Sequence, residues 1–387
     1  MSNALEAIAP KILARGMMQL RQKAIMPRLI NSDFSAEAAQ KGDTIDIPIG
    51  KSITVEDVTP SHTPPVVPDH SASTVSIKLN NWKRAAFYLT DKELTQIDAD
   101  HAYVPLHMRE AISALASSVN SSVMQLFTQI DQIIGSPNNK LFTQDDTHKD
   151  KSYYMTKPVL DARKILNRKG APKEGRHGVL SMDNESELLA LPQFMDAHRT
   201  GDTNIAMSGE IGQKFGINWY GSDDIIHRER EADICAASTN YVKGDTDLII
   251  NGVDILIEEA DIIEEDLEII GSVAKVGDND LALRGKNITL KTGLSKVLNR
   301  SKNVTVSNSH YNNLVFHSDA FALAMRPLTS SATYNSLGNR IMSVTDPESG
   351  LSMRLEISRQ YKQTVWEFDI LWGVALVRPE WAVRLIG

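Results

Sequence analysis

The sequence predicts an α+β protein, in which long helices and groups of strands occupy separate stretches of the chain. Three observations support this class. Apolar and polar residues alternate on both sides of a proline-rich tip in residues 44–89, and apolar residues recur at three- and four-residue steps in residues 104–134. Short apolar runs separated by glycine and aspartate turns fill residues 232–309. With 387 residues, the chain is long enough for two or three compact units.

The N-terminal stretch predicts a short helix. Apolar residues such as Leu5 and Ile12 lie on one side of it, Pro10 and Gly16 interrupt it, and Pro27 ends it. A short first helix before an extended segment is expected to be peripheral and not part of the core.

Residues 44–89 predict a long β-hairpin with no cover in its own chain. The prolines at its tip disfavour a central strand. An isolated two-stranded ribbon is marginal in water, and no adjacent segment has the pattern of a cover. We therefore expect this hairpin to be an arm that rests on another subunit. Its alternating apolar positions are Ile45, Ile47, Ile49, Ile53, Val55, Val75, Ile77 and Leu79.

Side chains along this arm are the expected contacts to a neighbouring subunit. Tryptophan and arginine are enriched at protein interfaces, so the basic pair Lys83-Arg84 beside Trp82 is expected to meet carboxylates of a neighbour. A small nucleic-acid patch is the alternative for this pair. The predicted interface residues are Val55, Pro60, Pro64, Pro65, Val67, Trp82 and Lys83.

Residues 104–134 predict a long helix, ended by the Gly135-Ser-Pro137 turn. Such a helix would contain about 30 residues and extend roughly 45 Å. Alanines and serines lie between its large apolar positions, which allows other backbones to approach closely. We expect a spine helix packed on more than one side; a core helix of an α/β enzyme is the alternative.

The rest of the chain predicts a mixed region with an insertion. Residues 158–230 alternate short helices and strands, as in a small α/β domain, with a helix over 186–194. The β-rich stretch 232–309 follows, and residues 313–328 return to a strand-then-helix pattern, so the β-rich stretch is expected to be inserted. Residues 370–377 are apolar on both faces, which predicts a buried central strand.

Composition and motifs argue against several functional classes. The formal net charge of −8 disfavours a protein that wraps nucleic acid, because that requires a basic face. No apolar run is long enough for a transmembrane helix, and no phosphate-binding loop, nucleophile motif or zinc pattern occurs. The single cysteine, Cys235, is expected to be a small buried apolar residue and suits a reducing cytoplasm. We expect no catalytic, cofactor-binding or metal-binding residues and no cofactor.

An acidic run at residues 258–268 is the strongest metal candidate. It lacks the alternating carboxylates and the glycine of a calcium loop. A solvated charged face is the favoured interpretation, and a docking face for a basic partner is the minority one.

Four segments, in order, resemble the major capsid (coat) proteins of tailed bacteriophages, within the short-tailed-phage coat family that has an inserted β domain. The first is the arm, KGDTIDIPIGKSITVEDVTP with NNWKRAAFYLTDKEL, and the second is the alanine- and serine-rich helix at 101–134. The third is LDARKILNRKGAPKEGRHGVLS with GEIGQKFGINWYGSDDI. The fourth is AFALAMRPL with WGVALVRPEWAVRLIG.

This resemblance implies the capsid-shell fold shared by tailed phages and herpesvirus floor domains. It implies seven segments, which are an N-terminal arm at 1–34, an extended loop at 35–95, a peripheral domain with the spine helix at 96–157, an axial domain at 158–231 and 312–340, an inserted β-rich domain at 232–311, and C-terminal strands of the peripheral domain at 341–387.

The resemblance also implies a function. The chain would self-assemble, as hexamers and pentamers, into the icosahedral shell around a double-stranded DNA genome, without sequence-specific DNA binding and without a membrane. A scaffolding protein and a portal protein are the other implied partners. The implied location is the virion, with assembly in the host cytoplasm, and no enzymatic activity is implied.

Three other functions stay open at this point. One is another virion part, such as a tail or decoration protein, which the long spine helix disfavours. An encapsulin-like bacterial compartment uses the same shell fold, although the β insertion favours the phage family. An α/β enzyme with a β lid is the alternative from a different class, and it would require polar groups that converge in a pocket.

Overall fold

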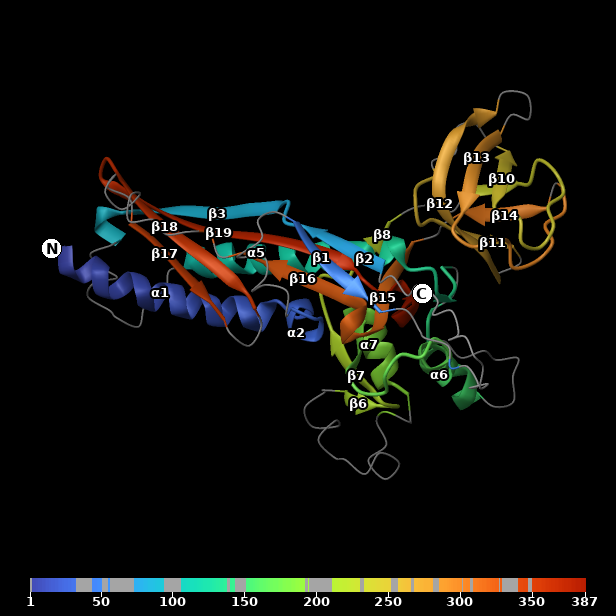
Figure 1. Ribbon diagram of the computed structural model, residues 1–387, viewed down its shortest axis with the longest axis horizontal. Helices are drawn as coiled ribbons and strands as arrows, with labels where there is room; N and C mark the ends of the chain where they lie inside the picture. The colour runs from blue at the N-terminus through green and yellow to red at the C-terminus, as the bar shows by residue number, and fades with distance from the viewer. Residues whose placement is uncertain are drawn as a thin grey trace, which may run out of the picture. The chain divides into compact units, whose positions relative to one another are not determined.

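The structure is a computed structural model, and it combines helices with mainly antiparallel sheets, which confirms the α+β class (Figure 1). The chain divides into two compact units, Met1–Val119 with Phe321–Val377 and Asn120–Ala320 with Arg378–Gly387. This division is coarser than the seven predicted segments, whose boundaries stay predictions. The residues that the structure describes are 2–32, 44–50, 55, 73–93, 106–137, 140–142, 151–191, 194, 211–229, 233–251, 257–265, 268–280, 285–300, 302–306, 309–326, 328, 340–346 and 350–387.

The first unit is organised around a long antiparallel sheet. Its strands run in the order β16 (Phe321–Met325), β19 (Gln363–Leu376), β18 (Ser352–Gln360) and β17 (Arg340–Thr345), and β3 (Asn81–Thr90) also pairs with β19. Strand β19 contacts three other strands and buries Trp366 and Trp372. The predicted central strand is therefore confirmed.

The helix predicted within residues 313–328 is wrong. Residues Phe321–Met325 form strand β16, and all five are buried. They pair with Trp372–Leu376 of β19. A short run that is apolar on every side satisfies the pattern of a buried strand as well as that of a helix, and here the sheet decides between them.

Helix α1 (Ser2–Lys23) is continuous, so the predicted interruptions at Pro10 and Gly16 are wrong. Its residues Ile12 and Leu20 are buried, and α1 belongs to the core of the first unit instead of its periphery. A Cβ at Gly16 would lie 2.9 Å from Ile112 Cδ1 and 3.2 Å from Met353 Cε. Glycine therefore allows the close approach of neighbouring elements. The short helix α2 (Met26–Leu29) follows.

The predicted spine helix is shorter than expected. Helix α5 (Leu106–Met124) gives way to the 3₁₀ helix η1 (Gln125–Gln129), and Ile133–Gly135 form strand β4. The Thr128 hydroxyl donates to the Gln125 carbonyl at 3.2 Å within the tightened turn. Strand β4 then pairs in parallel with Arg384–Ile386. Pairing with the chain's C-terminal strand thus overrides the helical periodicity of this stretch.

The second unit contains a seven-stranded sheet in the order β4-β20-β15-β5-β7-β6, with β8 also paired to β15. Two helices accompany it, α6 (Lys151–Arg168) and α7 (Met182–Leu189). The strands not yet introduced are β5 (Arg176–Leu180), β6 (Gly212–Lys214), β7 (Ile217–Gly221), β8 (His227–Arg228), β15 (His310–His317) and β20 (Ala382–Ile386).

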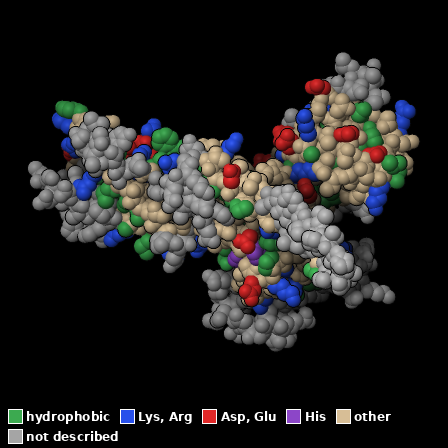
Figure 2. Space-filling model, in the orientation of Figure 1, with side chains coloured by type: hydrophobic (Ala, Val, Ile, Leu, Met, Phe, Trp, Pro, Cys, Tyr) green, Lys and Arg blue, Asp and Glu red, His purple; other side chains and the backbone are tan. Residues whose placement is uncertain are grey.

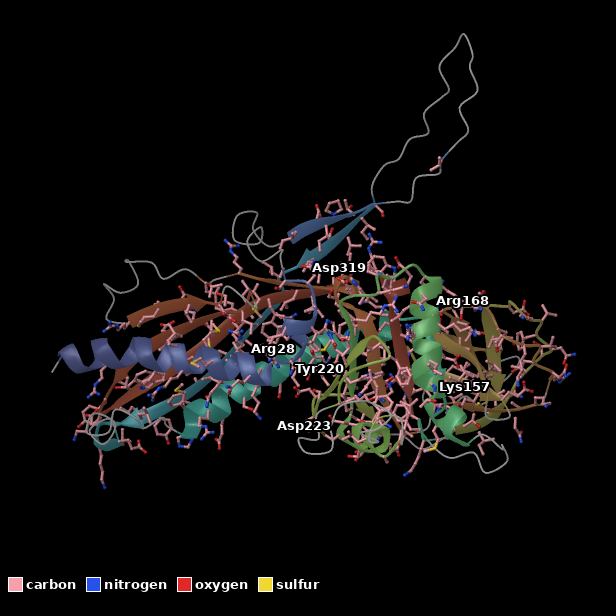
Figure 3. The ribbon with its side chains drawn as sticks, turned by 90° about the horizontal axis from the view of Figure 1, so that it is seen from below. Arg28, Lys157, Arg168, Tyr220, Asp223 and Asp319 are labelled. Carbon is pink, nitrogen blue, oxygen red and sulfur yellow. The ribbon has the colours of Figure 1, made fainter. Side chains whose placement is uncertain are left out.

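The two helices follow local sequence signals. Helix α6 buries Val159, Ala162 and Leu166, while Lys157 and Arg168 lie on its exposed side (Figure 3). Helix α7 begins at Met182, before the predicted start at residue 186, because the Ser181 hydroxyl caps it by accepting from the Asn184 N–H at 3.3 Å.

The β-rich stretch forms a six-stranded sheet with its own core, in the order β10-β13-β12-β11-β14-β9. We call this sheet the β module. Its strands fall within residues 232–309, as the turn spacing predicts. They are β9 (Asp233–Ala236), β10 (Asp247–Asn251), β11 (Ile262–Glu265), β12 (Glu268–Asp280), β13 (Gly285–Leu290) and β14 (Asn303–Val306).

The structure predicts that His177 makes the fold sensitive to acid. Its ring lies 6.0 Å from that of Tyr220 and 6.1 Å from that of Phe316, and burial, aided by the charge of His317, lowers the pKa of His177 to about 4. Between about pH 6.5 and pH 4, His177 is therefore protonated in the unfolded chain but neutral in the folded chain. Stability should fall in this window, by at most about 1.4 kcal/mol for each pH unit.

The measurement is the free energy of unfolding in urea between pH 7.5 and 4.5, compared between the parent and His177→Gln. The difference between the two proteins should change with pH below 6.5, because the variant lacks the titrating ring. Parallel pH profiles for the two proteins would show that His177 has no such role.

Candidate functional site

The base of the predicted arm is a two-stranded ribbon that packs on its own chain. Strands β1 (Thr44–Ile49) and β2 (Ser73–Lys78) pair in antiparallel register from Thr44↔Lys78 to Ile49↔Ser73. Their inner face carries alternating apolar residues, which form a buried cluster with the first unit's sheet. The buried members of this cluster are Ile45, Ile47, Ile77, Leu79, Ala322, Ala324 and Val377.

The expectation that this ribbon has no cover in its own chain is therefore wrong for its base. The cover consists of strands β16 and β19, which lie far downstream in the sequence. Neither strand adjoins the ribbon in the sequence, and for this reason the local pattern could not identify them. The hairpin pairing itself is confirmed over Thr44–Ile49 and Ser73–Lys78.

Gly373 is the residue that the sequence reasoning missed at this site. A Cβ at this position would lie 2.3 Å from the Lys78 carbonyl oxygen and 2.9 Å from Ile77 Cγ2. The ribbon thus approaches the backbone of β19 as closely as glycine permits. A glycine inside a strand pattern indicates such an approach, and the run Trp372-Gly-Val-Ala carries that signal.

Most of the predicted contact residues at the tip lie outside the described residues. These are Pro60, Pro64, Pro65 and Val67. Between β1 and β2, the structure describes Gly50 and Val55, and Val55 is 99% exposed. An apolar residue in that setting gains nothing from its own chain, so burial against another molecule would stabilise it.

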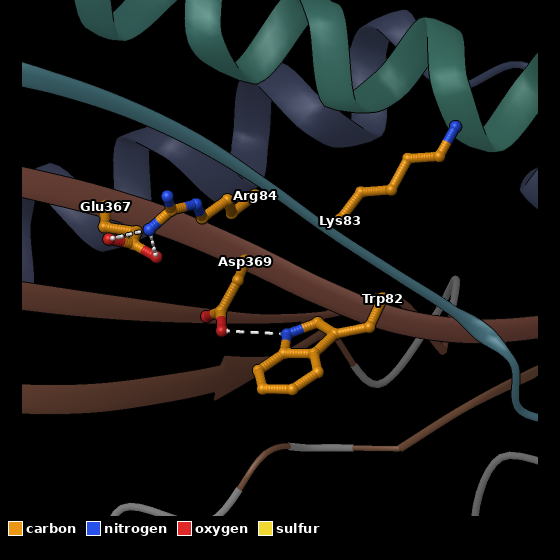
Figure 4. A pocket seen from close by; sticks show the side chains of 5 residues that line it. All are labelled: Trp82, Lys83, Arg84, Glu367 and Asp369. Carbon is orange, nitrogen blue, oxygen red and sulfur yellow. Dashed lines mark hydrogen bonds and ion pairs between the residues drawn. The ribbon is translucent and has the colours of Figure 1, made fainter.

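Trp82 and Lys83 lie next to each other on β3 and point to opposite sides of it (Figure 4). Trp82 donates its indole N–H to Asp369 Oδ2 at 3.1 Å but keeps 63% of its surface exposed. Lys83 donates to Ser118 Oγ at 2.8 Å, on the side of α5. The exposed indole is therefore open to a partner, whereas the ammonium group already has an acceptor in its own chain.

Arg84 also has a partner in its own chain. Its Nη1 donates to Glu367 Oε1 at 3.1 Å and to Oε2 at 3.2 Å (Figure 4). Arg84 is thus paired with a carboxylate of its own chain, whereas the acceptor of Lys83 is a neutral hydroxyl, and a contact of this pair with the carboxylates of a neighbouring subunit stays a prediction. Trp82, Lys83, Arg84, Glu367 and Asp369 line a surface depression of about 360 Å³.

The acidic run is not a solvated face at its centre. Asp261, Glu264 and Glu265 are buried, although Glu258 and Glu259 are exposed. Glu264 accepts from the Ser136 hydroxyl, and the other two buried carboxylates pair with basic groups of the same chain. Arg228 forms ion pairs with Asp261 and Glu258, and Lys296 and Lys302 lie 3.4 Å and 3.3 Å from the carboxylate of Glu265. Basic groups of the same chain therefore neutralise Asp261 and Glu265, and a docking face for a basic partner stays a prediction for the exposed members of the run.

No arrangement suited to catalysis emerges from the part of the chain that the structure describes. Within it, no group of three or more His, Cys, Asp or Glu side chains could hold a metal ion. Cys235 is buried, and burial, aided by the charge of Asp233, raises the pKa of its thiol to about 12. The thiol is therefore protonated at neutral pH and is a poor nucleophile.

The visible surface carries mixed charge. In Figure 2, basic and acidic side chains of the described residues are interspersed on the face shown and do not gather into one basic patch. The described helices include none that is long and apolar enough to cross a lipid bilayer.

Comparisons with known proteins find similarity at the level of the fold. No protein-family model matches the chain, and no curated protein matches it. Among solved structures, it is similar to one of Mycobacterium phage Che8, with 13% identity, a TM-score of 0.49, and coverage of 94% of this chain and 90% of that chain. The capsid structure of cyanophage P-SCSP1u has 12% identity, a TM-score of 0.48, and coverage of 89% and 83%.

A virus-like particle from Pyrococcus furiosus is also similar, with 8% identity, a TM-score of 0.44, and coverage of 97% of this chain and 98% of that chain. At such identities the likeness concerns the fold alone.

We predict that Gly373→Val displaces the base of the ribbon. The new side chain would collide with the backbone of Lys78, which cannot move away without breaking the β1–β2 pairing. Overpacking of this kind costs about 1–3 kcal/mol. The free energy of unfolding in urea should decrease by this amount. The hydrogen-exchange rates of the backbone amides in Thr44–Ile49 should increase.

Gly50→Ala is the matched control. A Cβ at Gly50 meets no atom within 4 Å, so this variant should stay within about 0.5 kcal/mol of the parent. Equal stability and equal exchange for Gly373→Val and the parent would contradict the close approach described above.

Proposed function

We propose that the chain is the major capsid protein of a tailed bacteriophage, which self-assembles into the icosahedral shell that encloses the double-stranded DNA genome. The observation that carries the proposal is the ribbon. Its base is fixed on the sheet of its own chain through Ile45, Ile77 and Gly373, while Val55, beyond the base, is almost completely exposed. Such an element is suited to contact a second copy.

The ordered sequence resemblance supports the same conclusion. The arm, the alanine- and serine-rich helix, the α/β stretch and the final strands occur in the order of the coat family. The structure has a counterpart for each: the ribbon β1–β2, helix α5, the α6 and β5 region, and strands β19 and β20.

The proposed mechanism of assembly uses two parts of the arm, namely the base β1–β2, which is packed on its own chain, and the tip, which would contact the next copy. The tip would bind the next copy, which in turn binds another, and head-to-tail contacts of this kind close into rings of five or six and then into a shell. A standard interface buries about 1,600 Å² in total. Val55, the tip residues Pro60, Pro64, Pro65 and Val67, and the exposed Trp82 are the proposed contacts, and Lys83 supports the strand that carries Trp82.

The charge of the chain suits a container. A net charge of −8 with interspersed acidic and basic groups does not neutralise phosphates, so the wall would enclose DNA without adsorbing it. In this proposal, a scaffolding protein and a portal protein are further partners, and the protein is located in the virion after assembly in the host cytoplasm.

Two of the alternatives receive less support. An encapsulin-like compartment would use the same ribbon, but the β module with its own core favours the phage coat family. An α/β enzyme with a β lid requires convergent polar groups, whereas the depression beside Trp82 is lined by side chains already paired with one another.

A hairpin of minimal length tests the proposal. Because Ile49 pairs with Ser73, residues 50–72 can be replaced by Asn-Gly, which favours the two-residue turns that close hairpins. The base should keep its packing, so far-UV circular dichroism and the melting temperature of the subunit should be nearly unchanged. Negative-stain microscopy, with and without the scaffolding partner, should show shells or sheets for the parent and none for the variant.

A second variant that replaces residues 56–72 with glycine and serine keeps the length of the loop and removes its apolar and proline side chains. It should also fail to assemble, because the proposal assigns the contacts to those side chains. Normal particles from the Asn-Gly variant, or a parent that stays a monomer in both conditions, would overturn the proposal.

A further inference from the structure

Of the buried polar atoms in the second unit that have no hydrogen-bond partner, four belong to residues around the Arg228–Asp261 ion pair. Within the described part of the chain, they are Ser272 Oγ, Lys291 Nζ, Arg384 Nε and Arg384 Nη1. The Arg384 side chain is fully buried, and the stem of Lys291 is partly exposed while its ammonium group is not. Buried polar groups are nearly always hydrogen-bonded, so a cluster of such atoms requires an explanation.

These groups come from two parts of the second unit. Arg384 lies on β20, whereas Ser272 lies on β12 and Lys291 directly follows β13 in the β module. The Lys291 N–H donates to the Ser272 carbonyl at 2.9 Å, which keeps these two residues side by side. Ser272 in turn pairs with Ile262, the residue after Asp261.

Arg384 lies close to the same place. Its Cζ is 4.8 Å from the centroid of the Phe127 ring, and Arg228 Cζ is 6.0 Å from that centroid. Arg228 forms an ion pair with Asp261. The two guanidinium groups thus share one aromatic ring, and both are near the carboxylate of Asp261.

Two of the buried carboxylates nearby already accept hydrogen bonds from other donors, while Asp131 and Glu259, whose charges also act on Lys291, are exposed. Asp261 accepts from Arg228 and, at 2.9 Å, from the Glu258 N–H, and Glu264 accepts from Ser136 Oγ at 2.5 Å. Arg384 Nη2 donates to Asn312 Oδ1 at 2.6 Å, which holds the guanidinium group in place. The remaining guanidinium nitrogens and the Lys291 ammonium group are donors that require an acceptor.

We propose that a single small inorganic anion of the halide class, such as chloride, binds between Lys291 Nζ and the guanidinium group of Arg384. A water molecule would leave the two buried positive charges uncompensated, whereas an anion accepts from both groups and neutralises them. The Ser272 hydroxyl is a further donor to the same ion. The anion would fasten the β module to the strand that carries Arg384.

The ionisation of the two cations is consistent with this site. Burial, followed by the charge of Arg228, lowers the pKa of Arg384 to about 9. Burial, followed by the charge of Arg384, lowers the pKa of Lys291 to about 8, although Asp131 and Glu259 act in the opposite direction. A bound anion would raise both pKa values, because it stabilises the charged forms.

The test uses the full-length soluble subunit, with chloride exchanged for gluconate at constant ionic strength. For the parent, we expect a saturable rise in melting temperature of about 3 °C as chloride increases to 100 times its dissociation constant. Lys291→Gln should lose most of this rise. Lys275→Gln, which alters an exposed lysine of the neighbouring strand β12, should keep it.

A second measurement does not depend on stability. The ³⁵Cl resonance of dissolved chloride should broaden in the presence of the parent and of Lys275→Gln, and at least half of this broadening should disappear for Lys291→Gln. A parent without a chloride-specific change in melting temperature, or equal line broadening for the parent and Lys291→Gln, would overturn the proposal. Both readouts are independent of whether the chain forms shells.

Discussion

The first unit depends on the close approach of the ribbon to strand β19 at Gly373. No other residue permits the Lys78 carbonyl to come so near, since even a methyl group would lie 2.3 Å from its oxygen. Around this point the sheet presents Ala322 and Ala324, and the ribbon fills the space above them with Ile45 and Ile77. A marginal two-stranded element thereby becomes an ordered one.

Because of this packing, only part of the arm would require a neighbouring subunit to bury its apolar side chains. The base of the ribbon needs no neighbour, because its apolar face is buried within one chain. Among the described residues outside this cluster, Val55 and Trp82 keep most of their surface exposed. Under the proposed function, a base that is already fixed on its own sheet confines the ordering cost of association to the residues that meet the neighbouring copy.

The second unit buries charged side chains at positions where apolar side chains would avoid the cost of desolvation. Strand β11 contributes Glu264 and Glu265, and Asp261 precedes it; all three carboxylates are buried and have basic or hydroxyl partners. Removing one partner of such a pair leaves an uncompensated buried charge, which is strongly destabilising. These pairs therefore allow the β module only the arrangement in which the charges meet.

The sequence alone determined the elements whose signals are local. Alternation with a period of two identified the pairing strands β1 and β2, turn spacing identified the strands of the β module, and a run apolar on both faces identified β19 as central. It also named Trp82 and Val55, which the structure leaves exposed.

Tertiary structure decided what depends on residues far apart in the chain. It covered the ribbon with β16 and β19, made Phe321–Met325 a strand instead of a helix, and ended α5 at Met124 so that Ile133–Gly135 could pair with the C-terminal strand. It also buried the centre of the acidic run beside Arg228. The physical reason is that burial and charge pairing depend on which distant segments meet, and periodicity within a short window carries no information about that.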